Sequence, residues 1–234
     1  MDLKTEALLF QTPTSRVRRN FTASYFVEKS TKLGRLVRIY TNLADQIWLN
    51  LESDPHVVDY NEAPKTISIA NGSKVFQKQF RFSVRRDDGT IQVISTMDEI
   101  KADKEEVEGA EDAIEFLNEE EAIRVWANSQ DIEYLLITKD SIAGNVQRLA
   151  NLRLMLKFIE TAHQCRYPEV EETIENTIRK LAPVQIRRVI EHLPTLEETL
   201  IIALIARNIL SEHYCAPIDK RDFDGALVID LGNP

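Results

Sequence analysis

The chain has 234 residues and a formal net charge of -9, with 43% hydrophobic and 29% charged residues. This composition is ordinary for a globular protein and excludes a fibrous or wholly disordered chain. The negative charge argues against a uniformly basic surface that binds nucleic acid on all sides. The longest apolar run, Leu200 to Ile205, is far shorter than the about 20 residues needed to span a bilayer, so no membrane partner is expected.

The sequence begins without the basic, apolar and small-residue regions of a signal peptide, so we expect a cytoplasmic protein. Cys165 and Cys215 stand without a CxxC pair or a zinc-finger spacing. We therefore expect both thiols to be packed in the core rather than bound to a metal or joined in a disulfide.

Residues 1–15 have little periodicity and predict an extended or poorly ordered N-terminal arm. A basic segment follows, interleaved with Phe21, Tyr25 and Phe26 and containing one acid, Glu28. Its cations are Arg16, Arg18, Arg19, Lys29, Lys32, Arg35 and Arg38. Such a segment predicts contact with a DNA backbone, because Lys and Arg release the counterions of the phosphates. The alternative is a solvated edge whose aromatic side chains lie in the core.

The next elements predict a mixed α/β domain. Residues 43–53 place apolar side chains at helical spacing, and the Asp-Pro pair that follows ends the helix. Residues 56–69 predict two short strands, and residues 74–97 predict an alternating hairpin with Asp88 and Gly89 at its turn. Residues 98–128 predict one or two helices with a solvated acidic face, and residues 132–138 predict a buried strand. We therefore predict a first domain at 1–138, with a mixed sheet flanked by helices.

Residues 139–234 predict a mostly helical second domain. A helix opens after Thr138, and three more follow, punctuated by Pro168, Pro183 and Pro194. A turn-rich hairpin closes the chain, so helices followed by a small hairpin predict a winged-helix-like module. Arg187 and Arg188 lie at a possible recognition-helix start, where they could reach DNA; a solvated helix face is the alternative.

Several segments, taken in order, resemble one known family. They are LESDPHVV and DYNEAPKTI within residues 33–69, RRDDGT in the hairpin, and then RVWANSQDIEYLLITKDSI and LANLRLMLKFIETA. In this order they resemble TnsA-type endonucleases, the nuclease partners of heteromeric DDE transposases, from Arg16 to Ile159. The resemblance implies a restriction-endonuclease-like first domain, binding to transposon-end DNA and a DDE-type transposase partner. It also implies an AAA+ regulator as a further candidate partner.

That family resembles nucleases of the PD-(D/E)xK class. In this class a helix Glu, a hairpin Asp and a strand acid bind Mg²⁺, and a Lys two residues beyond the strand acid orients the attacking water. Matching the chain to this pattern puts the helix Glu at Ala44 and the hairpin Asp at Arg81. The strand acid and the Lys fall on Ser95 and Met97. All four catalytic positions are lost in this alignment, so the resemblance implies a nuclease framework without its metal site.

Other acids near these positions leave an active nuclease open as an alternative. Asp45 is one residue from Ala44, a step that turns a helix by about 100°. Asp88 lies in the hairpin turn, where acids are usually solvated. Glu99 and Lys101 follow the last strand and would share one face only if that strand continued. A Mg-dependent DNA endonuclease with migrated acids would need these residues to meet; otherwise no cofactor is expected.

Arg81 and Arg85 are predicted to share one strand face. If they line the vacated cleft, they would hold phosphate without cutting it; simple surface charge is the alternative. Together these features predict a catalytically inactive TnsA-like subunit that binds DNA ends, a transposase or both. A third hypothesis is an interaction or regulatory module in a mobile element or a defence system.

Overall fold

A computed structural model of the chain describes residues 1–11, 25–72, 74–97, 110–142, 146–162 and 168–231. It is a mixed α/β structure that divides into two compact units. Unit 1 comprises Met1–Trp48 and His56–Ala143, and unit 2 comprises Leu49–Pro55 and Gly144–Pro234. The predicted domain boundary, between residues 138 and 139, stays a prediction.

Unit 1 is built on a four-stranded sheet and two separate hairpins. Its helices are α1 (Leu3–Phe10), α4 (Ala110–Ser129) and α5 (Lys139–Ile142), together with the first part of α2 (Asn42–Ser53), whose residues from Leu49 onward belong to unit 2. Its strands are β1 (Tyr25–Ser30), β2 (Arg35–Tyr40), β3 (Val57–Asn61), β4 (Ile67–Asn71), β5 (Lys74–Lys78), β6 (Phe82–Arg86), β7 (Ile91–Thr96) and β8 (Glu133–Ile137). The sheet order is β3-β6-β7-β8, with β7 and β8 parallel and the other pairs antiparallel, while β1–β2 and β4–β5 pair as hairpins. The parallel pair needs a crossover connection, and α4 lies within it.

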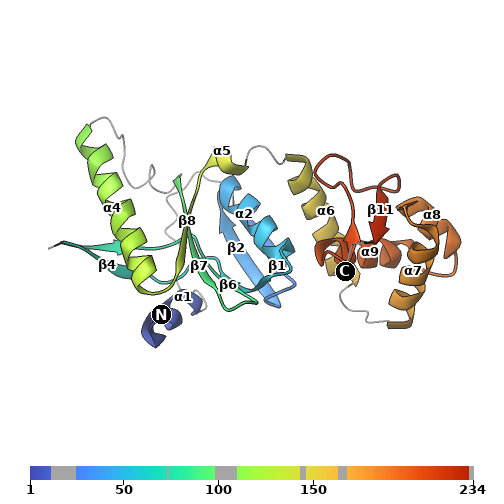
Figure 1. Ribbon diagram of the computed structural model, residues 1–234, viewed down its shortest axis with the longest axis horizontal. Helices are drawn as coiled ribbons and strands as arrows, with labels where there is room; N and C mark the ends of the chain where they lie inside the picture. The colour runs from blue at the N-terminus through green and yellow to red at the C-terminus, as the bar shows by residue number, and fades with distance from the viewer. Residues whose placement is uncertain (12–24, 73, 98–109, 143–145, 163–167, 232–234) are drawn as a thin grey trace. The chain divides into compact units, whose positions relative to one another are not determined.

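Helices cover both faces of this sheet (Figure 1). On one face, Val93 of β7 packs in a core cluster with Leu9 of α1 and Ile123 of α4. On the other face, Trp48 of α2 donates its indole N–H to the hydroxyl of Tyr60 on β3 over 2.7 Å. Neighbouring residues of a strand point to opposite faces, so each residue of β6 and β7 can be assigned to the α1/α4 face or to the α2 face.

The prediction of an extended or poorly ordered N-terminal arm is wrong for Leu3–Phe10, which form the helix α1. Asp2 caps this helix by accepting a 2.7 Å hydrogen bond from the backbone N–H of Thr5. Leu9 is 0% exposed, and its carbonyl accepts hydrogen bonds from Asn61 (2.8 Å) and Ser83 (2.6 Å). The weak local periodicity hid this helix, because distant residues of the sheet hold it in place. Residues 12–15 of the predicted arm lie outside the described residues.

The other predicted elements of unit 1 form close to their predicted positions, with one exception in pairing and one in burial. The hairpin predicted at 74–97 is formed by β6 and β7 alone, because Lys74–Lys78 form β5 and pair with β4 in a separate hairpin. The helix at 43–53 is α2, the Asp88-Gly89 turn joins β6 to β7, and 110–129 is the helix α4. Strand β8 was expected to be buried, but its residues are half-buried or exposed, because it lies at the edge of the sheet. The hairpin β1–β2, closed by Gly34 at a φ of 63°, was not predicted.

Unit 2 combines helices with a small three-stranded sheet. Its helices are α6 (Val146–Ala162), α7 (Pro168–Leu181), α8 (Ile186–His192) and α9 (Glu198–Leu210). Strands β9 (Val184–Gln185), β10 (Tyr214–Cys215) and β11 (Val228–Leu231) pair in the antiparallel order β10-β11-β9. The predicted helix at 183–193 therefore begins with a strand, because Val184 and Gln185 pair with β11 before α8 starts.

The loop between β10 and β11 is held against α6. Asn151 of α6 is 3% exposed and donates to the carbonyls of Ile218 and Arg221, each over 2.7 Å. Its side-chain carbonyl accepts from the backbone N–H of Phe223 over 2.9 Å. Leu152 and Met155 of the same helix pack in the core with α9, so α6 covers both α9 and the loop.

Cys215 corrects the expectation that both thiols are in the core, because it is exposed. It lies on the edge strand β10 next to Tyr214, which is 5% exposed. Consecutive side chains of a strand alternate, so an inward tyrosine turns its neighbour outward. Cys165 lies outside the described residues.

Candidate functional site

Arg81 lies just before β6 and reaches the start of α2. Its Nη2 donates to the backbone carbonyl of Tyr40 and lies 3.4 Å from Oγ1 of Thr41. That hydroxyl also accepts a 3.2 Å hydrogen bond from the backbone N–H of Ala44. Thr41 therefore links the guanidinium to the first turn of the helix. The predicted motif positions Ala44 and Arg81 are brought to the same place.

The turn that Arg81 contacts has an unusual backbone. Thr41 has a positive φ of 101°, which β-branched residues rarely adopt. Such a conformation persists where surrounding contacts hold it, and it often occurs at functional sites. The hydrogen bonds from Arg81 and from the first turn of α2 supply such contacts.

The charge at this position is positive on the strand side and negative on the helix side. Ala44 is 0% exposed and carries no oxygen ligand, whereas Asp45, the next residue, is 5% exposed. The backbone N–H of Asp45 donates to the carbonyl of Thr41 over 3.1 Å, which places Asp45 in the first turn. A carboxylate in the first turn of a helix is stabilised by the helix dipole.

Of the two motif positions predicted at the end of β7, Ser95 lies on the face of the sheet opposite to α2. Ser95 is two residues from Val93 and shares its face, so it lies on the α1/α4 face of the sheet. Met97 follows the last strand residue and is half-buried. At this end of β7 the residue on the α2 face is Thr96. Like Ser95, it carries a hydroxyl and no carboxylate, which is the ligand that Mg²⁺ prefers. Ala44 and Arg81 therefore meet at the start of α2, whereas Ser95 lies on the other face of the sheet.

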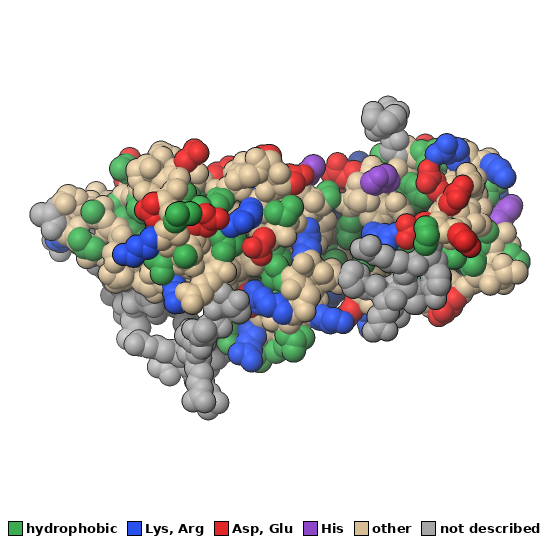
Figure 2. Space-filling view, turned by 90° about the horizontal axis from the view of Figure 1, so that it is seen from below, with side chains coloured by type: hydrophobic (Ala, Val, Ile, Leu, Met, Phe, Trp, Pro, Cys, Tyr) green, Lys and Arg blue, Asp and Glu red, His purple; other side chains and the backbone are tan. Residues whose placement is uncertain are grey.

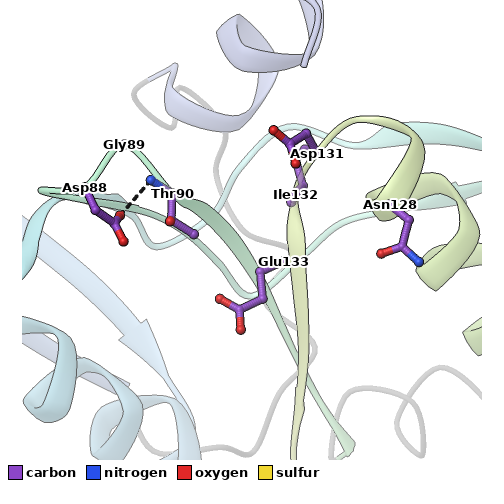
Figure 3. A pocket seen from close by; sticks show the side chains of 7 residues that line it. All are labelled: Asp88, Gly89, Thr90, Asn128, Asp131, Ile132 and Glu133. Carbon is purple, nitrogen blue, oxygen red and sulfur yellow. Dashed lines mark hydrogen bonds between the residues drawn. The ribbon is translucent and has the colours of Figure 1, made fainter.

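Asp88 lies at the other end of the hairpin, in a polar pocket. The pocket has a volume of about 550 Å³ and is lined by Asp88, Gly89, Thr90, Asn128, Asp131, Ile132 and Glu133 (Figure 3). The backbone N–H of Thr90 donates to Asp88 over 2.8 Å, and this bond lowers the pKa of the carboxyl. Arg81 and the end of β6 at Arg86 are five residues apart, which is about 17 Å at a rise of about 3.4 Å per residue. Asp88 is therefore not available to a metal site at the start of α2.

The remaining candidates for a metal site give no cluster. Glu99 and Lys101 lie outside the described residues. Within the part of the chain that the structure describes, no group of three or more His, Cys, Asp or Glu side chains is arranged to hold a metal ion. The residues present at Ala44, Arg81 and Ser95 do not fit Mg²⁺, because they offer no carboxylate and place a cation beside the expected ion position.

The predicted DNA-binding cations of the basic segment divide into three groups. Arg16, Arg18 and Arg19 lie outside the described residues. Lys32 and Arg35 contact the protein itself: Lys32 donates to the carbonyl of Val57 over 2.7 Å, and Arg35 forms a bidentate pair with Glu62 at 2.8 and 2.7 Å. That pair raises the pKa of Arg35 above its ordinary value. Lys29 and Arg38 are exposed on the hairpin β1–β2.

Lys29 and Arg38 share the outer face of this hairpin with large apolar side chains. The register pairs Tyr25 with Tyr40, Val27 with Arg38 and Lys29 with Leu36. Tyr25 is 54% exposed and Leu36 is 62% exposed, whereas Val37 and Ile39 on the inner face are buried. In the space-filling view, Lys and Arg side chains gather beside hydrophobic ones near the middle of the picture (Figure 2). Alternation in YFVEKS and RLVRIY was the signal that could have predicted this face.

Arg85 does not share a site with Arg81. Its Nη2 pairs with Glu6 of α1 over 2.6 Å, and its guanidinium lies 4.6 Å from the ring centroid of Phe10. Arg85 therefore lies on the α1/α4 face, whereas Arg81 contacts the start of α2, which packs on the opposite face. The expectation that both line one strand face is wrong, because Arg81 precedes the strand and turns away from its alternation.

Arg187 and Arg188 are exposed in the short helix α8. The backbone N–H of Arg187 donates to the carbonyl of Gly225 over 2.9 Å, so its residue packs on the loop between β10 and β11. The helix before that loop is α9, which begins with Glu197 and Glu198 rather than with arginines. The two arginines therefore do not open the helix that precedes the hairpin.

Comparison with models of known protein families finds no match, and comparison with curated proteins finds no significant match. Among the described residues, no helix is both long and apolar enough to cross a membrane.

Proposed function

We propose that this protein is a non-cleaving, TnsA-like subunit of a heteromeric transposition system, which binds transposon-end DNA, a DDE-type transposase or both. The observation that supports this most directly is Arg81. Its guanidinium is hydrogen-bonded at the start of α2, beside Ala44, where an active nuclease of this class keeps two metal-binding acids.

The order of elements supports the framework in this proposal. The segment α2-β3-β6-β7-α4-β8 builds a four-stranded mixed sheet covered on both faces, which is compatible with a restriction-endonuclease-like domain. In unit 2 the order α7-β9-α8-α9-β10-β11 is compatible with a winged-helix-like module. Fold and chemistry are separable, because apolar patterning specifies the sheet while catalysis depends on a few residues.

An active Mg-dependent endonuclease with migrated acids is less well supported. It requires carboxylates close enough to share one ion, with ligand distances near 2.1 Å. Asp88 lies in the turn of the β6–β7 hairpin, whereas Asp45 lies in the first turn of α2, which Arg81 contacts from the other end of that hairpin. Glu99 lies outside the described residues. No catalytic step is therefore assigned to this chain.

The cleavage arm of the test uses the full chain and supercoiled plasmid DNA with Mg²⁺ or Mn²⁺, in the presence and absence of the transposase. The expected result is that adding the protein produces no nicking or linearisation beyond that of the transposase. The Asp45→Asn variant is the control. Cleavage that the protein adds and Asp45→Asn removes would overturn the proposal.

The binding arm distinguishes a transposition subunit from an unrelated interaction module. We expect the full chain to retard duplexes carrying the transposon ends, to co-purify with the transposase, or to do both. An AAA+ regulator of the same element is a further bait in the same assay. If neither DNA nor these proteins bind, the alternative of a regulatory module in a mobile element or a defence system takes its place.

A further inference from the structure

The outer face of the hairpin β1–β2 combines features that rarely occur together on a solvated surface. It carries Tyr25, Val27, Lys29, Leu36, Arg38 and Tyr40, which alternate along the two strands and pair across them. The inner face is anchored, since Val37 is 0% and Ile39 is 2% exposed. A two-stranded hairpin in isolation is only marginally stable, so this anchoring is what presents the outer face to solvent.

The apolar part of this face is aromatic as well as aliphatic. The rings of Tyr25 and Tyr40 lie with centroids 5.1 Å apart at 36°, and Tyr25 is the more exposed of the two. Val27 is 46% exposed and lies beside Tyr25 on the same strand face. The ring of Tyr40 therefore supports the ring of Tyr25, and the exposed part of Tyr25 can stack with a planar ligand.

The charge of the face has a single sign. Among the described residues of the two strands, its charged members are Lys29 and Arg38, whereas Glu28 points to the inner face. Arg35 belongs to the inner face, where it forms an ion pair with Glu62. Two cations that flank exposed aromatic and aliphatic side chains complement a ligand with anionic groups and apolar planes.

We propose that the outer face of β1–β2 binds single-stranded nucleic acid, with unpaired bases stacking on Tyr25 and the backbone phosphates contacting Lys29 and Arg38. Base stacking requires faces that a duplex hides, so the surface should select unpaired nucleotides over paired ones. This inference deepens the proposed function by naming the form of DNA that the protein holds, and it rests on that function.

The test measures binding of the full chain to fluorescein-labelled oligothymidine of about 20 nucleotides and to a duplex of the same length by fluorescence anisotropy. The single strand should bind about tenfold or more tightly than the duplex. Tyr25→Ala should weaken single-strand binding about tenfold, a typical loss for one stacked base, and Tyr25→Phe should retain it. Equal affinity for both probes, or no effect of Tyr25→Ala, would overturn the inference.

A second measurement tests the phosphate contacts. The double variant Lys29→Ala/Arg38→Ala should reduce the slope of log affinity against log salt by about 1.4, since each single-strand phosphate contact contributes about 0.7. The matched control is Lys74→Ala/Lys78→Ala, which removes two cations from the other hairpin, β4–β5. An unchanged slope in the first variant, or an equal change in the control, would count against this surface.

The outcomes separate this inference from the proposed function. If the protein co-purifies with the transposase but Tyr25→Ala leaves oligonucleotide binding unchanged, the single-strand surface is wrong and the proposed function stands. If no oligonucleotide binds and Tyr25→Ala abolishes co-purification, the face is a protein-docking surface, which also overturns the inference.

Discussion

At the scale of single residues, a few buried polar contacts connect segments that are far apart in the sequence. The indole N–H of Trp48 and the hydroxyl of Tyr60 meet over 2.7 Å, and the two side chains are 4% and 1% exposed. Arg81 similarly connects the hairpin to the start of α2. A buried donor that loses its acceptor bears the full cost of desolvation, so removing one partner of such a contact should measurably lower the free energy of unfolding.

The Tyr60→Phe variant should therefore destabilise the protein by about 1–2 kcal/mol, because the Trp48 N–H loses its acceptor while the ring packing is kept. Urea denaturation followed by tryptophan fluorescence measures this change. The control is Tyr25→Phe, which removes a hydroxyl from an exposed ring. Equal stability of the Tyr60→Phe variant and the wild type would show that the hydrogen bond contributes little.

Tyr214 predicts a dependence of stability on high pH. It is 5% exposed, and burial raises its pKa to about 12. An unfolded tyrosine ionises at a pH of about 10, so above that pH the unfolded state releases its proton first. The contribution of Tyr214 is complete below pH about 10 and is lost as the pH rises toward about 12.

The measurement is the thermal midpoint at several pH values from about 9 to about 11.5. The midpoint of the wild type should fall more steeply with pH than that of Tyr214→Phe, whose side chain has no proton to release. Tyr25→Phe, again on an exposed ring, should follow the wild type. Parallel curves for the wild type and Tyr214→Phe would contradict the assignment.

At the scale of elements, helices of both units are held by contacts outside their own segments. Asn151 of α6 satisfies three backbone groups of the loop between β10 and β11. Leu9 of α1 is buried against the four-stranded sheet of unit 1. Local helix propensity alone would leave α1 only marginally stable, because short helices gain most of their stability from tertiary packing.

Asn151→Ala should destabilise unit 2 by about 2–4 kcal/mol, since it leaves two carbonyls and one N–H without their partner. The matched control on the same helix is Gln147→Ala, which removes a contact with Asp222 and a 3.4 Å hydrogen bond donated to Oδ1 of Asn151. It keeps the three bonds between Asn151 and the loop and should cost about 1 kcal/mol or less. Chemical denaturation followed by far-ultraviolet circular dichroism compares them. Similar losses for the two variants would mean that the loop is not held through Asn151.

Leu9→Ala tests whether α1 is part of the folded unit. Its side chain is 0% exposed, so truncation should cost about 2–5 kcal/mol through lost burial and the cavity left behind. Leu3→Ala, at an 86% exposed position of the same helix, should change the free energy of unfolding little. If Leu9→Ala leaves the free energy of unfolding unchanged, α1 does not contribute to the folded unit and the predicted arm is correct.

Much of this level of structure could be predicted from the sequence. The spacing of apolar residues predicted α2, α4, α6, α7 and α9, and the Asp-Gly turn predicted the β6–β7 hairpin, because these signals are local. The β1–β2 hairpin and α1 were missed. Their strands and helix depend on partners such as Val37 and Leu9 that become buried only when distant segments meet.

At the scale of the whole molecule, the two units have separate cores and different fluorescence. Trp48 and Trp126 are the two tryptophans of the chain, and both belong to unit 1. The core of unit 2 is formed by α6 to α9 with the small sheet and includes Leu152 and Ile201, each 0% exposed. Tryptophan fluorescence therefore reports on unit 1, while circular dichroism reports on the helices of both units.

Leu152→Ala should cost unit 2 about 2–5 kcal/mol and shift the unfolding midpoint seen by circular dichroism more than the one seen by fluorescence. Leu154→Ala, at a 40% exposed position of the same helix, is the control. Identical shifts by both probes would show that the two units unfold as one cooperative structure.

The sequence by itself determined which side chains stand at the candidate motif positions and where the main helices and the β6–β7 hairpin run. Ala44, Arg81 and Ser95 carry no carboxylate whatever the fold, and apolar periodicity is a property of each segment alone. The tertiary structure alone decided which residues meet. It placed Arg81 at the start of α2, Ser95 on the opposite face, Arg35 against Glu62, and Lys29 and Arg38 beside exposed tyrosines. The physical reason is that pairing and burial depend on long-range partners, which a local pattern does not specify.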